Sequence, residues 1–261
     1  MSDETSFDVA VLGSGAGGLA AATFAALRGA RTVLIERTEF VGGTTALSAG
    51  SAWAPNTRLA VGVGAKDSPA KVHQYLENAI GNSSARSMRE TFISRVPEAI
   101  HTLLDETEVQ FRAYPKHPDY LCELEGSTTC GRALETLPFD GAKLGPDLAL
   151  IRPPIPELTI LGGLMVDRTD VGHLLSMRSS LGSLRHVLSL IGKHALDRCR
   201  FGRSTRLVMG NALVGRFLLS AKQAGVEIRM NTRVTGIEPG EKTSFLSLEG
   251  GETLRITGGI I

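Results

Sequence analysis

Short apolar runs and a helical pattern alternate at the start of the chain. Residues 7–12 form an apolar, partly β-branched run, as in a buried strand. Residues 17–28 are rich in alanine and predict a helix, and Gly29 is placed to end it in a left-handed conformation. Residues 32–35 predict a second buried strand. Strand, helix and strand in this order predict one βαβ unit.

The middle of the chain has a weaker pattern. Ser68 and Pro69 resemble a helix start, the serine as cap and the proline in the first turn. Pro97 is expected to separate two helices, because proline interrupts the helical hydrogen-bond ladder. Residues 109–156 are rich in proline, glycine and isolated polar side chains and predict mostly loop, whereas residues 170–200 predict a helix again.

The last part of the chain returns to a mixed pattern. Residues 211–224 predict a helix that Gly225 ends, and residues 226–230 predict a strand. Turns at 239–240 and 250–251 divide the remainder into a small antiparallel ribbon.

Composition and charge narrow the class of protein. The 261 residues are enough for a sizeable core, and 28 basic against 27 acidic residues argue against a nucleic-acid partner. The start of the chain is polar and acidic, unlike a signal peptide, and no stretch approaches the roughly 20 apolar residues of a membrane span. Three cysteines without a CxxC pair suit a reducing compartment, and six histidines have no metal-ligand spacing. We therefore expect a cytoplasmic protein with no metal site.

A glycine-rich turn joins the first predicted strand to the first helix. Gly13, Gly15 and Gly18 satisfy the GxGxxG pattern, and Glu36 follows the turn by about 20 residues, at the end of the second strand. Gly13 permits the tight turn, Gly15 lets the backbone approach a pyrophosphate, and Gly18 allows the helix to pack closely on the strand. The sequence therefore predicts a dinucleotide site.

The helix and the acid each have a task in this site. The helix N-terminus, with Ala16 and Gly17, directs N–H groups and partial positive charge at the phosphates. Glu36 can accept hydrogen bonds from a ribose diol, and its carboxylate would repel a 2′-phosphate, which disfavours an NADP-type ligand. An ordinary glycine-rich turn followed by a surface glutamate is the plainer alternative.

A second loop of small residues favours FAD over NAD. Gly42, Gly43, Thr44 and Thr45 follow the second strand, where a nicotinamide domain would normally begin its next helix. Such a loop can fold back toward the same diphosphate and accommodate the longer cofactor, and the small residues at 46–51 would leave room for a flat ring. A flexible surface loop and a plain NAD-binding module are the alternatives.

Longer motifs resemble the FAD-dependent oxidoreductase 2 family, which groups fumarate reductases with 3-ketosteroid Δ1-dehydrogenases. They are DVAVLGSGAGG at 8–18, VLIER at 33–37, GGTTALSAGSAWAPN at 42–56, HPDY at 117–120, GRALETLPFDGAKLG at 131–145, RPPIPE at 152–157 and TRLVMGNAL at 205–213. The Trp-x-Pro step at 53–55 is more similar to ketosteroid dehydrogenases than to fumarate reductases. The resemblance spans nearly the whole chain.

The resemblance implies a set of functional residues. Glu36 would hold the adenosine ribose, residues 43–45 would lie along the pyrophosphate, residues 48–50 would lie near the flavin ring, and Val234 would touch adenine through its backbone. Tyr120 is similar in setting to a tyrosine that assists the catalytic base; a loop tyrosine packed by its ring is the alternative. The cofactor-binding candidates are Gly13, Gly15, Ala16, Gly17, Gly18, Glu36, Arg37, Gly43, Thr44, Thr45, Ser48, Ala49, Gly50 and Val234.

The chain departs from the family pattern at two points. Ser204 replaces a glycine expected before Thr205. In the family, a strand, a glycine-rich flavin loop, a substrate domain and a last FAD segment follow the point where Ile261 stands, and residues 256–261 resemble the beginning of that strand. We therefore expect a truncated chain whose sheet lacks one parallel strand, which would leave apolar edges exposed and make the isolated chain unstable and inactive.

These observations predict an α/β fold: a Rossmann-type FAD-binding domain with a parallel sheet and helices, helical insertions and a small antiparallel β ribbon, with the substrate domain absent. Residues 1–62 would form the βαβ core and the flavin loop. Residues 63–204 would form a helical and loop insertion, and residues 205–261 would return to the FAD domain.

The complete enzyme is expected to remove two hydrogens from adjacent carbons beside a ketone. A carbonyl acidifies its α hydrogen, so that a tyrosinate-like base can take this proton, and the neighbouring carbon then delivers hydride to flavin N5. The expected substrate is a small hydrophobic, steroid-like ketone, and the sequence does not identify the electron acceptor. A fumarate-reductase-like enoate reductase and a truncated, inactive FAD-binding product are the alternatives.

Overall fold

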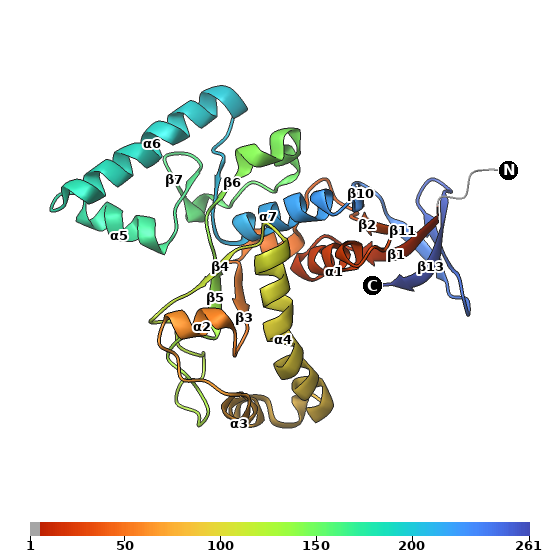
Figure 1. Ribbon diagram of the computed structural model, residues 1–261. Coiled ribbons are helices and arrows are strands. Elements are labelled where there is room, and N and C mark those ends of the chain that lie inside the picture. Colours follow the sequence, from red (N-terminus) through yellow and green to blue (C-terminus); the bar gives the residue numbers. More distant parts are fainter. Residues whose placement is uncertain (1–5) are drawn as a thin grey trace. The chain divides into compact units, whose positions relative to one another are not determined.

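The computed structural model describes residues 6–261 (Figure 1). The chain divides into two compact units. The first unit runs to Ser48 and resumes from Pro138 to Ile261, and the second unit comprises Ala49–Leu137. Among residues 6–261, no helix is both long enough and apolar enough to cross a lipid bilayer.

The first unit is built on a six-stranded sheet with the strand order β10-β2-β1-β13-β12-β11. The strands β10, β2, β1 and β13 run parallel to one another, which confirms the predicted parallel sheet. Their bounds are β1 Ser6–Leu12, β2 Thr32–Ile35, β10 Glu227–Arg229 and β13 Thr253–Ile260. Apolar side chains of the sheet form one buried cluster, made of Phe7, Ala10, Val33, Ile35, Leu246, Leu248, Leu254 and Ile256.

The antiparallel part of this sheet confirms the predicted ribbon and corrects one expectation. β11 (Val234–Glu238) and β12 (Ser244–Leu248) are antiparallel, and β12 is antiparallel to β13. The parallel strand that we expected to be missing is present, because β13 pairs with β1. A Cβ at Gly258 would lie 2.7 Å from the carbonyl oxygen of Asp8, so this glycine permits the close pairing and does not end the strand.

Two helices of the first unit pack against each other next to the parallel strands (Figure 1). The predicted α1 spans Ala16–Leu27 and is followed by Gly29 at φ +86°. The predicted α7 spans Met209–Gln223 and is followed by Gly225 at φ +84°. Both glycines therefore adopt the left-handed conformation expected at helix ends.

The remainder of the first unit consists of short elements and a pair of helices. A helix predicted to be continuous over 170–200 is two helices, because Ser180 accepts a hydrogen bond from the Ser183 N–H and caps a new start. The elements are η1 Gly43–Leu47, β6 Phe139–Asp140, η3 Gly141–Leu150, η4 Pro156–Leu158, β7 Thr159–Ile160, β8 Leu164–Met165, α5 Arg168–Ser176, α6 Leu181–Phe201 and β9 Arg206–Leu207.

The second unit combines helices with a three-stranded antiparallel sheet in the order β3-β5-β4. Most of 109–156 lies outside helices and strands, as expected, but the short strands β4 and β5 were not predicted, because they are too short for a period-two pattern to identify. The elements are β3 Ser51–Trp53, α2 Arg58–Gly62, α3 Pro69–Ile80, η2 Gly81–Ser83, α4 Arg86–Glu106, β4 Phe111–Ala113 and β5 Ala133–Thr136.

Two helix signals in this unit had different outcomes. The Ser68 side chain accepts a hydrogen bond from the Lys71 N–H, which confirms the predicted start of α3. Pro97 lies inside α4, so the prediction that it separates two helices was wrong. Ile93 and Ile100 are buried on either side of this proline, and their burial favours a continuous helix over the lost hydrogen bond.

Candidate dinucleotide-binding site

A cavity of about 690 Å³ lies at the carboxyl ends of β1 and β2, in the first unit. In open parallel sheets, ligands bind at this edge of the strands. The cavity is lined by Leu12, Gly13, Ser14, Gly15, Ile35, Glu36, Arg37, Thr38, Gly43, Thr44, Leu47, Arg152, Thr232, Arg233 and Val234.

The glycine turn has the backbone geometry that the motif demands. Gly13 adopts φ +97°, a conformation that strains any residue with a side chain. A Cβ at Gly18 would lie 2.0 Å from the carbonyl oxygen of Gly13, so α1 can pack on the turn only with glycine there. A Cβ at Gly15 would lie 4.0 Å from the Thr45 hydroxyl oxygen, an ordinary van der Waals distance, so this glycine is open toward the site.

The carboxylate of Glu36 is buried and accepts hydrogen bonds on both oxygens. Its Oε2 lies 2.9 Å from the Ser14 N and 2.5 Å from the Ser14 Oγ. Its Oε1 lies 2.9 Å from both the N and the Oγ1 of Thr38. The Gly42 N–H donates to the Ser14 hydroxyl, which links the carboxylate to the second loop.

The environment of Glu36 favours its ionised form. Burial alone would raise the pKa of this carboxyl group. The hydrogen bonds from Ser14 and Thr38 stabilise the carboxylate and outweigh burial, so the pKa lies below its ordinary value. Glu36 therefore carries a negative charge at the floor of the cavity at neutral pH.

The second loop folds back onto the first, as its small residues predict. The Ala16 N–H, at the start of α1, donates to the Thr45 hydroxyl at 3.1 Å. The Gly210 N–H, in the first turn of α7, donates to the Ser48 carbonyl oxygen, and a Cβ at Gly210 would lie 1.9 Å from the Thr45 carbonyl oxygen. α7 therefore holds the loop against the start of α1.

The predicted cofactor residues fall into three groups. Gly13, Gly15, Glu36, Arg37, Gly43, Thr44 and Val234 line the cavity. Ala16, Gly17, Gly18, Thr45 and Ser48 belong to the same unit, in α1 and the second loop. Ala49 and Gly50 belong to the second unit, where the Thr136 hydroxyl donates to the Gly50 carbonyl oxygen. Their roles toward a cofactor stay predictions.

Sequence reasoning missed several residues that line the cavity, and Arg152 is the most informative of them. Val41 and Ile151 form a parallel bridge, and this bridge brings Arg152 beside the second loop. The Arg152 guanidinium carbon lies 5.2 Å from the centre of the Phe40 ring, and its buried Nε has no hydrogen-bond partner within residues 6–261. The RPPIPE motif marked this position without indicating a contact. The other missed residues are Leu12, Ser14, Ile35, Thr38, Leu47, Thr232 and Arg233.

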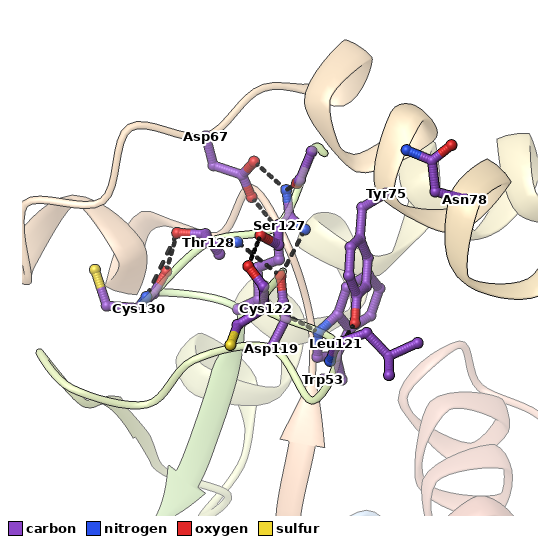
Figure 2. A network of polar contacts seen from close by, with 12 residues as sticks. Trp53, Asp67, Tyr75, Asn78, Asp119, Leu121, Cys122, Ser127, Thr128 and Cys130 are labelled. Carbon is purple, nitrogen blue, oxygen red and sulfur yellow. Dashed lines mark hydrogen bonds and ion pairs between the residues drawn. The ribbon is translucent and has the colours of Figure 1, made fainter. Parts of the chain in front are cut away.

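Tyr120, the catalytic candidate, lies in the second unit and its side chain is fully exposed. The neighbouring Asp119 is buried and accepts hydrogen bonds from the Trp53 indole and the Thr128 N–H (Figure 2). The Arg132 guanidinium donates to Asp119. Because the Tyr120 side chain is exposed, the alternative of a loop tyrosine packed by its ring is wrong. The buried residue of this loop is the neighbouring Asp119.

Arg132 connects this loop to the start of α3. It lies 2.7 Å and 2.8 Å from the Asp67 and Asp119 carboxylates, and all three side chains are almost completely buried. It also donates to the Gly126 carbonyl oxygen. Tyr120 is thus carried by a loop with a firmly fixed base.

The glycine turn, the buried acid and the folded-back loop agree with one family. A family model described as "FAD binding domain" matches residues 8–259. The chain belongs to this FAD-binding family. FAD is the cofactor of this family. The turn of this chain requires glycine at positions 13 and 18, and such a turn fits the diphosphate of FAD.

Two curated relatives are named as dehydrogenases of oxo compounds. The 3-oxosteroid 1-dehydrogenase of Mycolicibacterium smegmatis is 34% identical over 232 residues, which are 88% of this chain and 40% of that protein. The 4-oxocyclohex-2-ene-1-carboxylate 5-dehydrogenase of Sinomonas cyclohexanicum is 33% identical over 252 residues, 97% of this chain and 41% of that protein. The chain thus spans about 40% of the length of these relatives.

A solved structure agrees with this assignment. The 3-ketosteroid Δ1-dehydrogenase of Sterolibacterium denitrificans, in complex with 1,4-androstadiene-3,17-dione, matches with a TM-score of 0.84 at 25% identity. The match covers 98% of this chain and 47% of that one. A flavocytochrome c3 fumarate reductase shares the fold, with a TM-score of 0.56 at 14% identity over 98% of this chain and 33% of that one.

Proposed function

We propose that the cavity holds the adenylate half of FAD, with Glu36 facing the ribose. The diphosphate would lie between the start of α1, at Gly15 and Ala16, and the second loop, at Gly43. Support comes from the glycine geometry, the negative charge of Glu36 and the family match. Arg37, Thr44 and Val234 would complete the adenosine contacts, and Gly17, Gly18 and Thr45 would shape the diphosphate cradle.

The hydrogen bonds of Glu36 suggest how a ribose hydroxyl would be accommodated. A carboxylate offers about four acceptor positions, and the N–H and hydroxyl groups of Ser14 and Thr38 lie within hydrogen-bonding distance of its two oxygens. The Thr38 hydroxyl has one hydrogen and lies 2.9 Å from both Glu36 Oε1 and the Phe40 carbonyl oxygen. If the hydroxyl donates to Phe40, one acceptor position of Glu36 Oε1 opens for a ribose hydroxyl, while the Thr38 N–H keeps the other. Thr38 would therefore exchange partners when the cofactor binds.

Arg152 supplies the positive charge that the diphosphate requires. Its guanidinium borders the cavity beside Gly43 and Thr44, and its Nε has no partner within the described residues. A buried guanidinium N–H gains most from a charged acceptor such as a phosphate oxygen. Ser48, Ala49 and Gly50 are proposed to lie near the flavin ring, as the family resemblance implies.

The gene product that contains this chain is proposed to be an FAD-dependent dehydrogenase that acts on a CH–CH bond beside a ketone. The observation that carries this proposal is the match over 232 residues to 3-oxosteroid 1-dehydrogenases. When bound, FAD supplies a hydride acceptor. The steroid-like substrate would be oriented so that its ketone acidifies the α hydrogen, and Tyr120 would assist the base that takes this proton. We propose a cytoplasmic location, which three unpaired cysteines support.

A smaller ring ketone is the second candidate substrate. The cyclohexenecarboxylate dehydrogenase relative matches 97% of this chain at almost the same identity as the steroid enzyme. Both relatives are named as dehydrogenases of a compound with an oxo group, so the chemistry proposed for this protein is the same in either case. A fumarate-reductase-like direction is a weaker candidate, because the matching NADH:fumarate oxidoreductase covers 38% of this chain.

Anaerobic stopped-flow absorbance on the flavin-loaded gene product tests the activity. Bleaching of the flavin band by a 3-ketosteroid would support the steroid proposal, and bleaching by 4-oxocyclohexanecarboxylate alone would support the smaller ring. Reoxidation of reduced flavin by fumarate, without reduction by either ketone, would contradict the dehydrogenase. The 261-residue chain is measured alongside, because an FAD-bound chain that no ketone reduces would indicate a binding product without activity.

A further inference from the structure

A second cavity in the first unit lies apart from the residues of the dinucleotide site. It has a volume of about 390 Å³, which is in the range of pockets for small molecules. Its walls come from the proline-rich segment after Arg152, the β7–β8 hairpin, the C-terminal end of α6 and the segment that links α6 to α7. Neither the GxGxxG turn nor the second loop contributes to it.

The charge on its walls is entirely positive. Arg198, Arg203 and Arg206 line the cavity, and no aspartate or glutamate does. Arg206 is paired with Asp170 behind the wall, at 2.6 Å. The acid closest in sequence to the linking segment, Asp197, accepts hydrogen bonds from the N–H and hydroxyl of Thr205. The two remaining arginines therefore have no carboxylate partner within residues 6–261.

Arg203 is the central residue of this cavity. One guanidinium nitrogen donates to the backbone carbonyl oxygens of Leu148 and Ile151, which fixes the side chain. Burial without a neighbouring carboxylate lowers the pKa of Arg203 from its ordinary value. The Arg203 guanidinium is half-buried and, among the described residues, donates only to neutral acceptors. An anion would accept a stronger hydrogen bond from it than these carbonyl groups do.

Two further polar groups at the cavity lack partners. Ser204 is 6% exposed, and its hydroxyl has no hydrogen-bond partner in the part of the chain that the structure describes. The Nε of Arg206 is likewise buried and unpaired. Buried polar groups in native proteins are almost always hydrogen-bonded, so each such group needs an explanation. Ser204 is also the position at which the family resemblance led us to expect a glycine.

The rest of the wall is apolar. Pro153, Pro154, Pro156, Met165 and Leu207 contribute to it. We infer that the cavity binds a small organic oxyanion, a carboxylate carried on an apolar body, with Arg203 and Ser204 holding the anionic group. The planar guanidinium fork matches the two oxygens of a carboxylate, and the prolines and the methionine would cover the apolar body. The site does not depend on the proposed FAD contacts or on the dehydrogenase activity.

Isothermal titration of the 261-residue chain with benzoate, in low-chloride buffer, tests this inference. Benzamide has the same ring without the charge, and inorganic phosphate has the charge without the ring. We expect benzoate to bind at one equivalent, and benzamide and phosphate to bind at least tenfold more weakly. Equal binding of benzamide would reduce the site to an apolar cavity, and absence of benzoate binding would overturn the inference.

Variants locate the binding. Arg203→Gln is expected to weaken benzoate binding by about ten- to a hundredfold, because a charge-assisted hydrogen bond is lost. Arg185→Gln, on the exposed surface of α6, changes the net charge equally and should leave binding unchanged. Ser204→Ala is a second test of the site, in case the Arg203→Gln protein does not fold. It should weaken benzoate binding by about two- to tenfold. Unaltered affinity in a folded Arg203→Gln or Ser204→Ala protein would contradict the proposed contacts.

Discussion

The hydroxyl of Ser14 lies 2.5 Å from the carboxylate of Glu36, and this contact joins the two parts of the dinucleotide motif. Ser14 stands between the first two glycines of the turn, and Glu36 ends the neighbouring strand. The acid therefore has two tasks: it fixes the glycine turn in the described chain, and it is proposed to hold the ribose. A loss of flavin binding after mutation of Glu36 can come from either task, so variants must separate stability from affinity.

The glycine turn gives a paired prediction on stability. Gly18→Ala would place a Cβ 2.0 Å from the Gly13 carbonyl oxygen and should lower the free energy of unfolding by about 2–4 kcal/mol, within the range of severe packing defects. At Gly17, a Cβ would have no neighbour within 4 Å, so Gly17→Ala should raise it by up to about 1 kcal/mol. Urea unfolding followed by circular dichroism measures both. Equal changes in the free energy of unfolding of the two variants would show that helix propensity, and not close packing, determines the effect of alanine in this turn.

The charge of Glu36 predicts a pH dependence. Its pKa in the folded chain is below the ordinary 4.5, so its contribution to stability is present above pH 4.5 and is lost as the pH falls through the lowered pKa. Glu36→Gln should cost about 1–3 kcal/mol at pH 7, because donors of Ser14 and Thr38 lose a charged acceptor. The difference from the wild type should shrink in acid. Glu39→Gln, an exposed neighbour, is the control. A difference that stays constant down to pH 3 would argue against an ionised Glu36.

The proposed exchange of Thr38 predicts an unusual binding phenotype. Thr38→Val removes the hydroxyl that occupies Glu36 Oε1 and leaves the backbone N–H in place. The variant should bind FAD at least as tightly as the wild type, although the substitution removes a polar group from the cavity wall. Fluorescence quenching of FAD on titration with protein gives the dissociation constants. Binding more than about tenfold weaker, equivalent to 1.4 kcal/mol, would indicate that the hydroxyl itself contacts the cofactor.

The buried cluster beneath Tyr120 predicts a contrast between two aspartates of the second unit. Asp119→Asn breaks a buried pair with Arg132 and should cost about 3–5 kcal/mol. Asp105→Asn breaks a pair with Arg58 in which both side chains are about half exposed, so solvent screens the charges and the free energy of unfolding should stay almost unchanged.

The single tryptophan reports on this cluster directly. The Trp53 indole donates to Asp119 at 2.7 Å, so its emission should shift in the Asp119→Asn protein and stay unchanged in the Asp105→Asn protein. An equal loss of stability in both variants would contradict the prediction that the buried Asp119–Arg132 pair contributes more to stability than the exposed Asp105–Arg58 pair.

Local signals allowed much of the first unit to be predicted. The strand at residues 32–35 follows from its short apolar run, and the helix ends at Gly29 and Gly225 follow from the left-handed backbone conformation that glycine adopts without strain. The second loop was also predicted, since its small residues have few other uses in this position.

Non-local pairing accounts for what the sequence did not predict. β13 joins β1 across 250 residues of chain separation at Thr257 and Phe7, whereas the sequence marked residues 256–261 only as the beginning of a strand, without its partner. Arg152 reaches the cavity through a bridge between Val41 and Ile151, which no periodicity reveals. The domain boundaries at 62 and 204 and the assignments of individual cofactor contacts stay predictions.

Titration of the purified 261-residue chain with FAD, by calorimetry and by absorbance at the flavin bands, tests the central claim most directly. We expect one bound FAD per chain, weaker binding of NAD⁺, and a loss of affinity of at least tenfold in Glu36→Gln but not in Glu39→Gln. All proteins are compared at a temperature where circular dichroism shows each one folded. No flavin binding by the folded chain, or equal affinity in the Glu36→Gln protein, would contradict the account.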